Sequence, residues 1–382
     1  MAQADDPPDL DRRVASLGAA RLEAPVRSAL GDATARVTAW RHEPVAYDFL
    51  NPSSGGVYRF RGTAATGAGN REWSLVLKVT RSPDAAGDEQ PLPPGLAAAR
   101  REAVRWDREL LAYESGFLAR LDGPLVAAAC HGSRREDDDT GWLWLEDLGG
   151  DATGAWSREQ WGLVGRALGA FDGRFAGDGA PREPWLGRRW LRVWTTLLTP
   201  YHFGDALPGS PRWDDPRVRA VYGPDLRARL AALWDARPAL LAAVEALPSA
   251  CAHLDAHRRN LFLRPGEDGT RVVAIDWGLV GLAPLGEEIA STLVGSVASG
   301  EVPAVDATAL SETLYAAYLQ GLGDAGWEGA ERDVRLAYAA ASGLRAFSVT
   351  RLDAAEEATL AGAATLVALL AELGEEASSL LA

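Results

Sequence analysis

The stretch of sequence with the clearest chemical potential runs from Cys251 to Phe262 and reads CAHLDAHRRNLF. Within it His253, Asp255 and Asn260 have the spacing H-x-D-x-x-x-x-N. An aspartate in that position can accept a proton from an attacking hydroxyl, and the later asparagine can bind a metal ion beside phosphate groups. The chemistry that this spacing favours is the transfer of a phosphoryl group.

A second acidic group follows closely. Leu261–Leu263 and Arg271–Ile275 are predicted strands of a hairpin whose turn is Pro265–Gly269, and this hairpin would bring Asp276 next to Asn260. Gly278 follows two positions later, after Trp277. A carboxylate at the end of a buried apolar strand, followed by glycine, is suited to hold Mg²⁺ between phosphate oxygens.

Lys78 is the only lysine in the chain, and it lies in the apolar run Ser74–Thr80. Lysine is a compact point charge, whereas arginine is a planar fork, so a single lysine in an arginine-rich chain indicates a contact that arginine cannot make. Chance explains one lysine about equally well when the residue is taken alone. Upstream lies the small-residue turn Asn51–Gly56, in which Ser54, Gly55 and Gly56 could turn backbone N–H groups toward phosphate oxygens. Most turns of this kind only join two strands.

Each of these features has a structural alternative. Asp255 would serve as a helix N-cap, Asn260 as a turn residue and Asp276 as an ordinary strand end. His253 and His257 could be hydrogen-bonded core or surface groups, or zinc ligands, although no third His or Cys stands nearby at a suitable spacing. The ordered series of glycine turn, strand lysine, helix glutamate and two acidic motifs favours a shared function over coincidence.

The elements that would position these residues can be read from hydrophobic periodicity. A short helix is expected between Asp11 and Leu30, followed by strands at Val37–Ala46, Val57–Gly62 and Trp73–Thr80. A Pro- and Gly-rich linker, Ser82–Gly95, precedes a helix from about Leu96 to Leu121 that carries Glu109. Two further strands are expected, Leu125–His131 and Gly141–Leu145, separated by a polar turn at Arg134–Thr140, before a flexible hinge at Glu146–Gly150.

Helical periodicity dominates from Trp156 onward, with an apolar stripe of Trp161, Val164, Leu168 and Phe171. Residues 181–250 hold five tryptophans, which either pack an irregular helical subdomain or line a ligand pocket, and core packing is favoured for most of them. Three amphipathic helices are predicted near the C-terminal end, at Asp306–Leu322, Glu331–Arg351 and Ala354–Leu373.

The order of these motifs resembles the aminoglycoside phosphotransferase and choline kinase branch of the protein-kinase-like fold, over about residues 36–350. The residues that carry the resemblance are Cys251–Phe262, Ile275–Gly278, Trp106–Tyr113 and Leu143–Leu148. It implies an α+β, two-lobed fold, with a small N-terminal antiparallel β-sheet lobe containing one long helix and a larger, mainly α-helical C-terminal lobe. The expected domains are an extension at 1–35, a nucleotide-binding lobe at 36–148 and a catalytic lobe at 149–382, with an insertion at about 181–250.

The resemblance also implies roles for the candidate residues. Asp255 would be the catalytic base, Asn260 and Asp276 the Mg²⁺ ligands, and Lys78 would hold the nucleotide phosphates while pairing with Glu109. The remaining nucleotide-binding residues would be Ser54, Gly55, Gly56 and the backbone of Glu146, Asp147 and Leu148, and the supporting residues would be His253 and His257.

The chain departs from the pattern of this branch at three places. Leu254 stands where the branch usually has glycine, Trp277 replaces the phenylalanine of the protein-kinase motif, and Glu287–Ala290 stands where Asp-Leu-Ala is common. None of these changes removes a charged group from the reaction, but they leave the substrate subfamily open.

Composition limits the partners. A formal net charge of −14 argues against nucleic acid and anionic membranes, which favour basic surfaces. Cys130 and Cys251 are too few and too far apart for a disulfide framework, and the acidic N-terminal residues lack the apolar segment of a signal peptide. We therefore expect a soluble, cytoplasmic protein, monomeric or homodimeric.

The expected function is that of a kinase that uses ATP or GTP with Mg²⁺ to phosphorylate a hydroxyl of a small molecule, such as an aminoglycoside-like or other antibiotic or a related metabolite. A cationic acceptor could be received by acidic residues of the C-terminal half, although solvated loop carboxylates are the plainer interpretation for each of Asp172, Asp178, Asp205, Asp214, Asp215, Glu287 and Glu288. The alternatives are a ligand-sensing pseudokinase or nucleotide-binding regulator without turnover, and a scaffold that binds proteins through its aromatic segment.

Overall fold

The structure is a computed structural model, and it describes residues 8–45, 53–83, 98, 101, 103, 105–149, 155–266 and 269–382. These residues form two compact units. The first contains residues up to 83 together with 105–121 and 127–149, and the second contains 98, 101, 103, 122–126 and the residues from 155 onward. Most of the linker Ser82–Gly95 and parts of the predicted turn Asn51–Gly56 lie outside the described residues.

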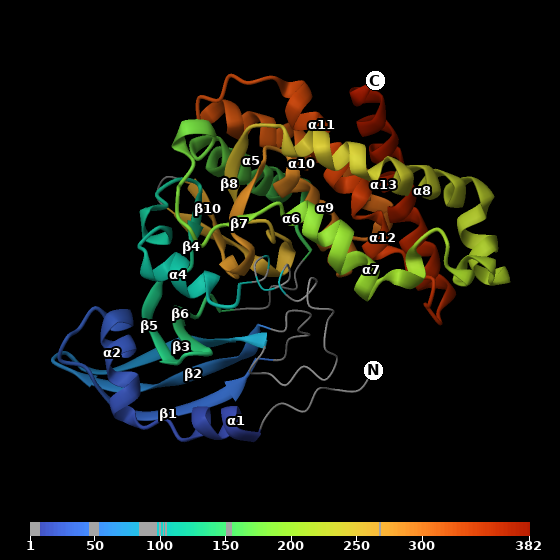
Figure 1. Cartoon of the computed structure of the whole chain (residues 1–382). Coiled ribbons are helices and arrows are strands. Elements are labelled where there is room, and N and C mark those ends of the chain that lie inside the picture. The colour runs from blue at the N-terminus through green and yellow to red at the C-terminus, as the bar shows by residue number, and fades with distance from the viewer. Residues whose placement is uncertain are drawn as a thin grey trace. The chain divides into compact units, whose positions relative to one another are not determined.

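The first unit is built on a five-stranded antiparallel sheet with the strand order β1-β2-β3-β6-β5 (Figure 1). The strands are β1 (Arg36–Pro44), β2 (Ser54–Thr66), β3 (Gly69–Arg81), β5 (Cys130–Asp137) and β6 (Thr140–Glu146). The polar turn predicted at Arg134–Thr140 was wrong in extent, because only Asp138 and Asp139 form the turn. The preceding polar residues belong to β5, which is an edge strand of this sheet and therefore tolerates exposed charges.

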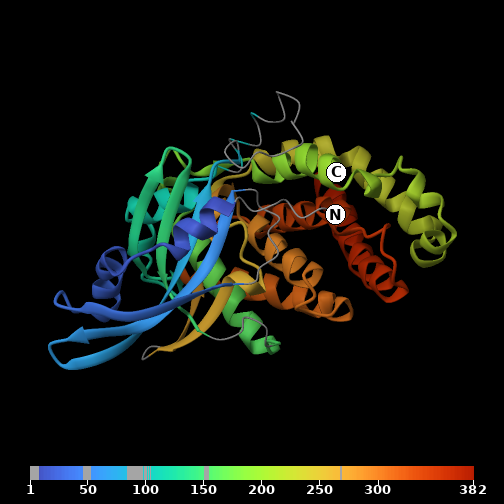
Figure 2. The ribbon, with the colours of Figure 1, turned by 90° about the horizontal axis from the view of Figure 1, so that it is seen from below.

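The two faces of this sheet carry different sets of side chains, because successive side chains along each strand point to opposite faces. On β3, Leu75, Leu77 and Val79 point to one face, where they form a core with α1 (Pro8–Ala15) and α2 (Ala19–Leu30). Figure 2 shows these two blue helices against the blue strands. The single helix expected before β1 is therefore a pair of helices. Lys78 alternates with these apolar residues and so points to the other face.

The other face packs against α4 (Arg108–Glu114), through Leu110 on the helix and Leu143 and Leu145 on β6. The helix expected from about Leu96 to Leu121 was wrong in length. Residues 105–107 form a turn immediately before α4, and a short 3-10 helix follows at Leu118–Arg120. The turn matters because it makes Glu109 a first-turn residue of a short, buried helix rather than a residue in the middle of a long one.

The second unit combines two small sheets with many helices. Its strands have the orders β4-β10-β9 and β7-β11-β8, and their bounds are β4 (Leu125–Ala127), β7 (Gly187–Arg188), β8 (Ser249–Ala252), β9 (Leu261–Gly266), β10 (Gly269–Ala274) and β11 (Gly281–Pro284). The helices are α5 (Arg158–Arg174), α6 (Trp190–Val193), α7 (Thr199–His202), α8 (Pro216–Glu245), α9 (Glu287–Ala298), α10 (Ala307–Asp324), α11 (Glu331–Leu344), α12 (Ala346–Val349) and α13 (Glu357–Leu381). The predicted fold class, a small antiparallel β unit followed by a mainly helical one, is confirmed.

Small residues let the helices of the second unit approach closely. A Cβ atom added at Gly169 of α5 would lie 2.1 Å from the Tyr318 carbonyl oxygen, and one at Gly321 of α10 would lie 2.1 Å from the Arg166 carbonyl oxygen. The predicted stripe on α5 is buried, as expected. Core packing is also confirmed for three tryptophans of the aromatic segment, since Trp185, Trp190 and Trp213 are buried.

The helix α13 is long and apolar enough to cross a membrane when judged by length and composition. Half of its most apolar window is buried inside the protein, where the helix packs against α8 and α11. A core helix of a soluble protein has these properties too, so α13 by itself does not indicate a membrane location.

Candidate active site

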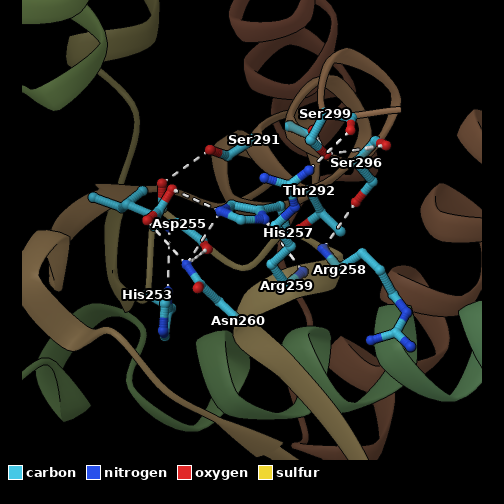
Figure 3. Close-up of polar contacts among 12 residues, drawn as sticks. His253, Asp255, His257, Arg258, Arg259, Asn260, Ser291, Thr292, Ser296 and Ser299 are labelled. Carbon is cyan, nitrogen blue, oxygen red and sulfur yellow. Dashed lines mark hydrogen bonds and ion pairs between the residues drawn. The ribbon is translucent and has the colours of Figure 1, made fainter. Parts of the chain in front are cut away.

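The catalytic motif predicted from the sequence forms one hydrogen-bonded loop between β8 and β9. The side-chain nitrogen Nδ2 of Asn260 donates to the carboxylate Oδ2 of Asp255 at 3.0 Å and to the Asp255 carbonyl oxygen at 2.9 Å (Figure 3). These two oxygen acceptors determine the orientation of the amide. The amide oxygen of Asn260 is thereby directed away from Asp255, and it is the atom that could bind a metal ion.

His253 ties this loop to the end of β10. Its Nε2 lies 2.9 Å from the carbonyl oxygen of Ile275, which can only accept, and its Nδ1 accepts from the backbone N–H of Asp255 at 3.2 Å. The ring is therefore a neutral imidazole with its proton on Nε2. It also packs against the buried indole of Trp277, with 4.5 Å between the ring centroids. His253 is a positioning residue between the two acidic motifs.

His257 is held on the other side of the same loop. Its Nδ1 accepts from the backbone N–H of Arg259 at 3.3 Å, and its Nε2 lies 3.2 Å from the Asn260 amide nitrogen and 3.9 Å from the Asp255 Oδ1. Burial lowers the pKa of His257 from its ordinary value, although the carboxylates of Glu301 and Asp276 act against this effect. The neutral form therefore predominates at pH 7.

The predicted hairpin delivers Asp276 as expected. Strands β9 and β10 pair in antiparallel register, with Leu261 opposite Ala274, and the backbone N–H of Ile275 donates to the carbonyl oxygen of Asn260 at 2.9 Å. Asp276 itself has φ of 61° and ψ of 62°, a left-handed conformation that is uncommon for residues other than glycine. Strained backbone of this kind often occurs at functional sites.

The loop between β8 and β9 is also held by α9, and the sequence motif did not indicate this contact. Leu254 has φ of 67°, which explains why glycine is the usual residue at this position in the branch that the sequence resembles. The backbone N–H of Leu254 donates to Glu288 Oε2 at 2.8 Å, and its carbonyl oxygen accepts from the Ser291 hydroxyl at 2.9 Å. These two bonds stabilise a conformation that leucine rarely adopts.

The same helix supports the second half of the loop (Figure 3). The Ser296 hydroxyl accepts from the backbone N–H of Arg258 at 3.1 Å. A Cβ atom added at Gly295 would lie 2.9 Å from the Cβ of His257, so only glycine allows the loop to approach α9 this closely. Sequence reasoning missed Ser291, Gly295 and Ser296, and the only available signal was their position soon after the Asp276 motif.

Two buried acidic residues, Asp172 and Glu288, lie close to the contact between the loop and α9. Asp172 of α5 accepts from the Tyr318 hydroxyl at 2.6 Å, and Tyr318 in turn accepts from the backbone N–H of Gly286 at 3.1 Å. Burial, together with the nearby charge of Glu288, raises the pKa of Asp172 well above its ordinary value. Burial also raises the pKa of Glu288 to about 7, although backbone N–H donors of the catalytic loop act against the shift.

Neither interpretation of these acids from the sequence, receipt of a cationic substrate or solvation in a loop, is right for three of them. Asp172, Glu287 and Glu288 are buried, and Glu287 lies 3.7 Å from Arg345, which is also buried. Their carboxylates interact with groups of the protein interior instead of being exposed to a ligand. Of the other candidates, Asp214 pairs with Arg227 at 3.0 Å and Asp215 caps the N-terminus of α8.

In the first unit, Lys78 and Glu109 form the ion pair that the family resemblance implied. The lysine Nζ lies 2.6 Å from the Glu109 Oε2, and the side chains are 14% and 2% exposed. The strand register places Lys78 between Val57 on β2 and Leu143 on β6, in the middle of the sheet. The pair fixes the direction of a side chain that has four rotatable bonds.

The glycine-rich turn, which we define as residues 53–56, consists of Ser53 and the first three residues of β2. Its pairing with β3 is interrupted between Ser54 and Gly56, so Gly55 is the extra residue of a β-bulge. Gly56 has φ of 129°, a conformation that residues other than glycine rarely adopt. The Ser54 hydroxyl is buried and has no hydrogen-bond partner among the described residues. A bulge with glycine backbone and an unsatisfied hydroxyl suits the binding of phosphate oxygens.

The hinge Glu146–Leu148 is anchored by its side chains. Asp147 accepts from the Ser74 hydroxyl and from Arg59 Nε at 3.0 Å, and although partial burial acts against it, these hydrogen bonds keep the pKa of Asp147 below its ordinary value. The backbone N–H of Glu146 donates to the Ala129 carbonyl oxygen at 2.9 Å, so it is not available to a base. A backbone N–H of this hinge that donates to adenine would have to be that of Asp147 or Leu148.

The chain resembles several solved structures at low sequence identity. Three of the solved structures that the chain resembles are a spectinomycin phosphotransferase in complex with ADP and spectinomycin (12% identity, 95% of this chain and 99% of that chain, TM-score 0.48), an aminoglycoside phosphotransferase from Alicyclobacillus acidocaldarius (18%, 90% and 92%, 0.44) and an ethanolamine kinase from Plasmodium vivax (12%, 86% and 82%, 0.43). No curated protein sequence matches the chain.

The sequence profile of one protein family, described as the phosphotransferase enzyme family and abbreviated APH, matches residues 57–332. This match covers more than half of the chain and includes Lys78, Glu109, Asp255, Asn260 and Asp276. The chain therefore belongs to the phosphotransferase enzyme family.

Proposed function

We propose that the protein is a small-molecule kinase that transfers the terminal phosphoryl group of ATP or GTP to a hydroxyl group. The observation that carries this proposal is the geometry of the catalytic loop, in which Asn260 holds the Asp255 carboxylate and the hairpin brings Asp276 beside Asn260. A loose transition state for phosphoryl transfer needs positioned groups and charge neutralisation more than it needs covalent chemistry. This loop supplies groups of that kind.

Asp255 is the proposed general base. Its Oδ2 is held by Asn260, and its side chain keeps 32% of its surface exposed, so a hydroxyl group can reach it. The neutral ring of His257 beside the other carboxylate oxygen adds no full charge, which leaves Asp255 able to accept a proton.

The oxygen atoms of Asn260 and Asp276 fit a hard divalent cation such as Mg²⁺, for which amide and carboxylate oxygens are suitable ligands. A bound cation would neutralise charge on the phosphate oxygens. In the first unit, the Lys78 ammonium and the glycine-rich turn would contact nucleotide phosphates, while Glu109 holds Lys78 in place.

The proposed acceptor is a small molecule with a free hydroxyl, such as an aminoglycoside-like antibiotic, another antibiotic or an amino alcohol. A net charge of −14 favours a cationic acceptor through long-range attraction. The same charge disfavours binding to nucleic acid or anionic membranes, and we propose a cytoplasmic enzyme that is a monomer or homodimer.

The proposal predicts that Asp255→Asn abolishes transfer while leaving the fold intact. Asparagine keeps the acceptor oxygen that Asn260 contacts but cannot take a proton, so we expect turnover to fall at least about a hundredfold. The measurement is acceptor-dependent release of ADP or GDP, with Mg²⁺, across a panel of aminoglycosides, nucleoside antibiotics, amino alcohols and sugars. Product phosphorylation is then confirmed by mass spectrometry.

The matched control is Asp353→Asn, which makes the same chemical change at an exposed position of the second unit. It should behave like the wild type. Equal turnover by Asp255→Asn and wild type would refute the role of Asp255. Nucleotide binding by the wild type without phosphorylation of any acceptor in a broad panel would favour a pseudokinase instead.

A further inference from the structure

The helix α1 lies outside the part of the chain that matches the family, because the match begins at residue 57. It packs on the face of the first unit's sheet that carries Leu77 and Val79, whereas Lys78 points to the opposite face. The helix therefore lies behind the proposed nucleotide-binding surface. Its Leu10 side chain reaches Gly55 of the glycine-rich turn, and its Asp11 side chain reaches Tyr58, which lies against Gly56.

The first contact is apolar. A Cβ atom added at Gly55 would lie 3.2 Å from the Leu10 Cδ2 and 2.8 Å from the Val79 Cγ1. The bulged glycine therefore rests directly on side chains of α1 and β3. Leu10 is buried in the same core cluster as Val79, so this support is part of the folded unit and not a loose surface contact.

The second contact is polar and reaches the next glycine. The Tyr58 hydroxyl donates to the Asp11 Oδ1 at 2.7 Å. The same hydroxyl would lie 2.9 Å from a Cβ atom added at Gly56, so the tyrosine ring covers one side of this residue. Asp11 thus fixes a side chain that limits where Gly56 can move.

We propose that α1 is a positioning element for nucleotide binding, which acts through Leu10, Asp11 and Tyr58 to keep the glycine-rich turn in the conformation that receives the phosphates. The inference rests on the proposed function and adds a residue set to it. Glycine-rich backbone has many accessible conformations, and ordering it when a ligand binds weakens the affinity. Contacts that order the turn beforehand should strengthen phosphate binding selectively.

The test compares two ligands of the full-length protein, Mg²⁺ with the non-hydrolysable analogue AMP-PNP and adenosine alone, by calorimetry. Asp11→Ala and Tyr58→Phe should each weaken AMP-PNP binding by about fivefold, at the lower end of coupling between sites, while adenosine binding is unchanged. The double variant should be no weaker than either single variant, because both changes break the same hydrogen bond.

The matched control is Arg13→Ala on the same helix. Arg13 lies 3.3 Å from Asp137 on β5 and takes no part in the contacts with Tyr58 or Gly55, so this change tests whether any disturbance of α1 matters. The control should bind both ligands like the wild type. Thermal unfolding of each apo variant reports any general loss of stability.

Three results would overturn the inference. Wild-type affinity for AMP-PNP in both Asp11→Ala and Tyr58→Phe would do so, and so would an equal loss of adenosine and AMP-PNP binding, which is the result of a merely structural role. If the wild type bound neither these ligands nor their guanine counterparts, GMP-PNP and guanosine, the proposed function itself would fail and the role of α1 with it. Binding by the wild type separates the first two results from the third.

Discussion

At the scale of single residues, Lys78 shows how a polar group is used inside an apolar sheet. The ammonium lies 2.6 Å from Glu109, and both side chains are largely removed from water. Burying one of the charges alone would be costly, so each group stabilises the charged state of the other. The pair also fixes where the ammonium points, and this is the property that phosphate binding requires.

Lys78→Arg is therefore expected to impair turnover although it retains the positive charge. A guanidinium is larger and planar, and it cannot occupy the position of an ammonium between Glu109 and a phosphate oxygen. We expect kcat/KM for the nucleotide to fall at least about tenfold, which corresponds to about 1.4 kcal/mol. The control is Arg71→Lys on the exposed part of the same strand, which should leave kcat/KM unchanged. Wild-type kinetics in Lys78→Arg would exclude a geometric role for the lysine.

At the scale of elements, α9 is the platform of the catalytic loop. Glu288 and Ser291 hold the two sides of Leu254, Gly295 makes room for His257, and Ser296 accepts from the backbone of Arg258. The loop thus obtains its shape from a helix that follows it in sequence. A change on α9 that never touches a substrate should still affect transfer.

Gly295→Ala tests this role with a single methyl group. The added Cβ would lie 2.9 Å from the His257 Cβ, so the loop must shift, and we expect a loss of about 1–3 kcal/mol in unfolding free energy together with lower kcat. Gly162→Ala in α5 is the matched control, because a Cβ atom there meets nothing within 4 Å. That variant should be as stable as the wild type or slightly more stable. Denaturant unfolding and turnover assays measure both effects, and an unchanged kcat in Gly295→Ala would contradict the platform role.

At the scale of the whole molecule, the second unit contains two buried carboxyl groups whose raised pKa values make the stability of the protein depend on pH. Asp172 and Glu288 are both buried, and burial raises the pKa of both carboxyl groups, while the charge of Glu288 raises the pKa of Asp172 further. A carboxyl group whose pKa is higher in the folded than in the unfolded state binds more protons when folded. Its contribution to stability is present at low pH and is lost as the pH rises through the folded pKa.

The stability of the protein should therefore decrease between about pH 5 and pH 8, since the pKa of Glu288 rises from its ordinary value of 4.5 to about 7. Asp172→Asn should reduce this decrease, because asparagine still accepts from Tyr318 but carries no charge beside Glu288. The difference in unfolding free energy between the variant and wild type should be largest at pH 8. Each unit by which the variant lowers the pKa shift of Glu288 corresponds to about 1.4 kcal/mol. Urea unfolding at pH 6 and pH 8 measures it, with the exposed Asp205→Asn as control. An identical pH dependence in Asp172→Asn and wild type would contradict the predicted protonation.

The local parts of the site could be predicted because they depend on residues close together in sequence. The hydrogen bonds between Asp255 and Asn260 lie within one loop, and the β9–β10 hairpin brings Asp276 to Asn260 through short-range pairing. Alternation along β3 likewise indicated a strand with Lys78 on one face. Errors appeared at the edges of elements, such as the turn before α4, where tertiary contacts override the helical pattern.

The sequence by itself determined the chemistry of this protein: which acids, amide and lysine are present, at which spacing, and in which order along the chain. Only the tertiary structure decided what supports them. It placed α9 against the catalytic loop, α1 behind the glycine-rich turn, and Asp172 and Glu288 in the interior. Contacts between distant segments depend on how whole elements pack, and no local pattern of residue types encodes that packing.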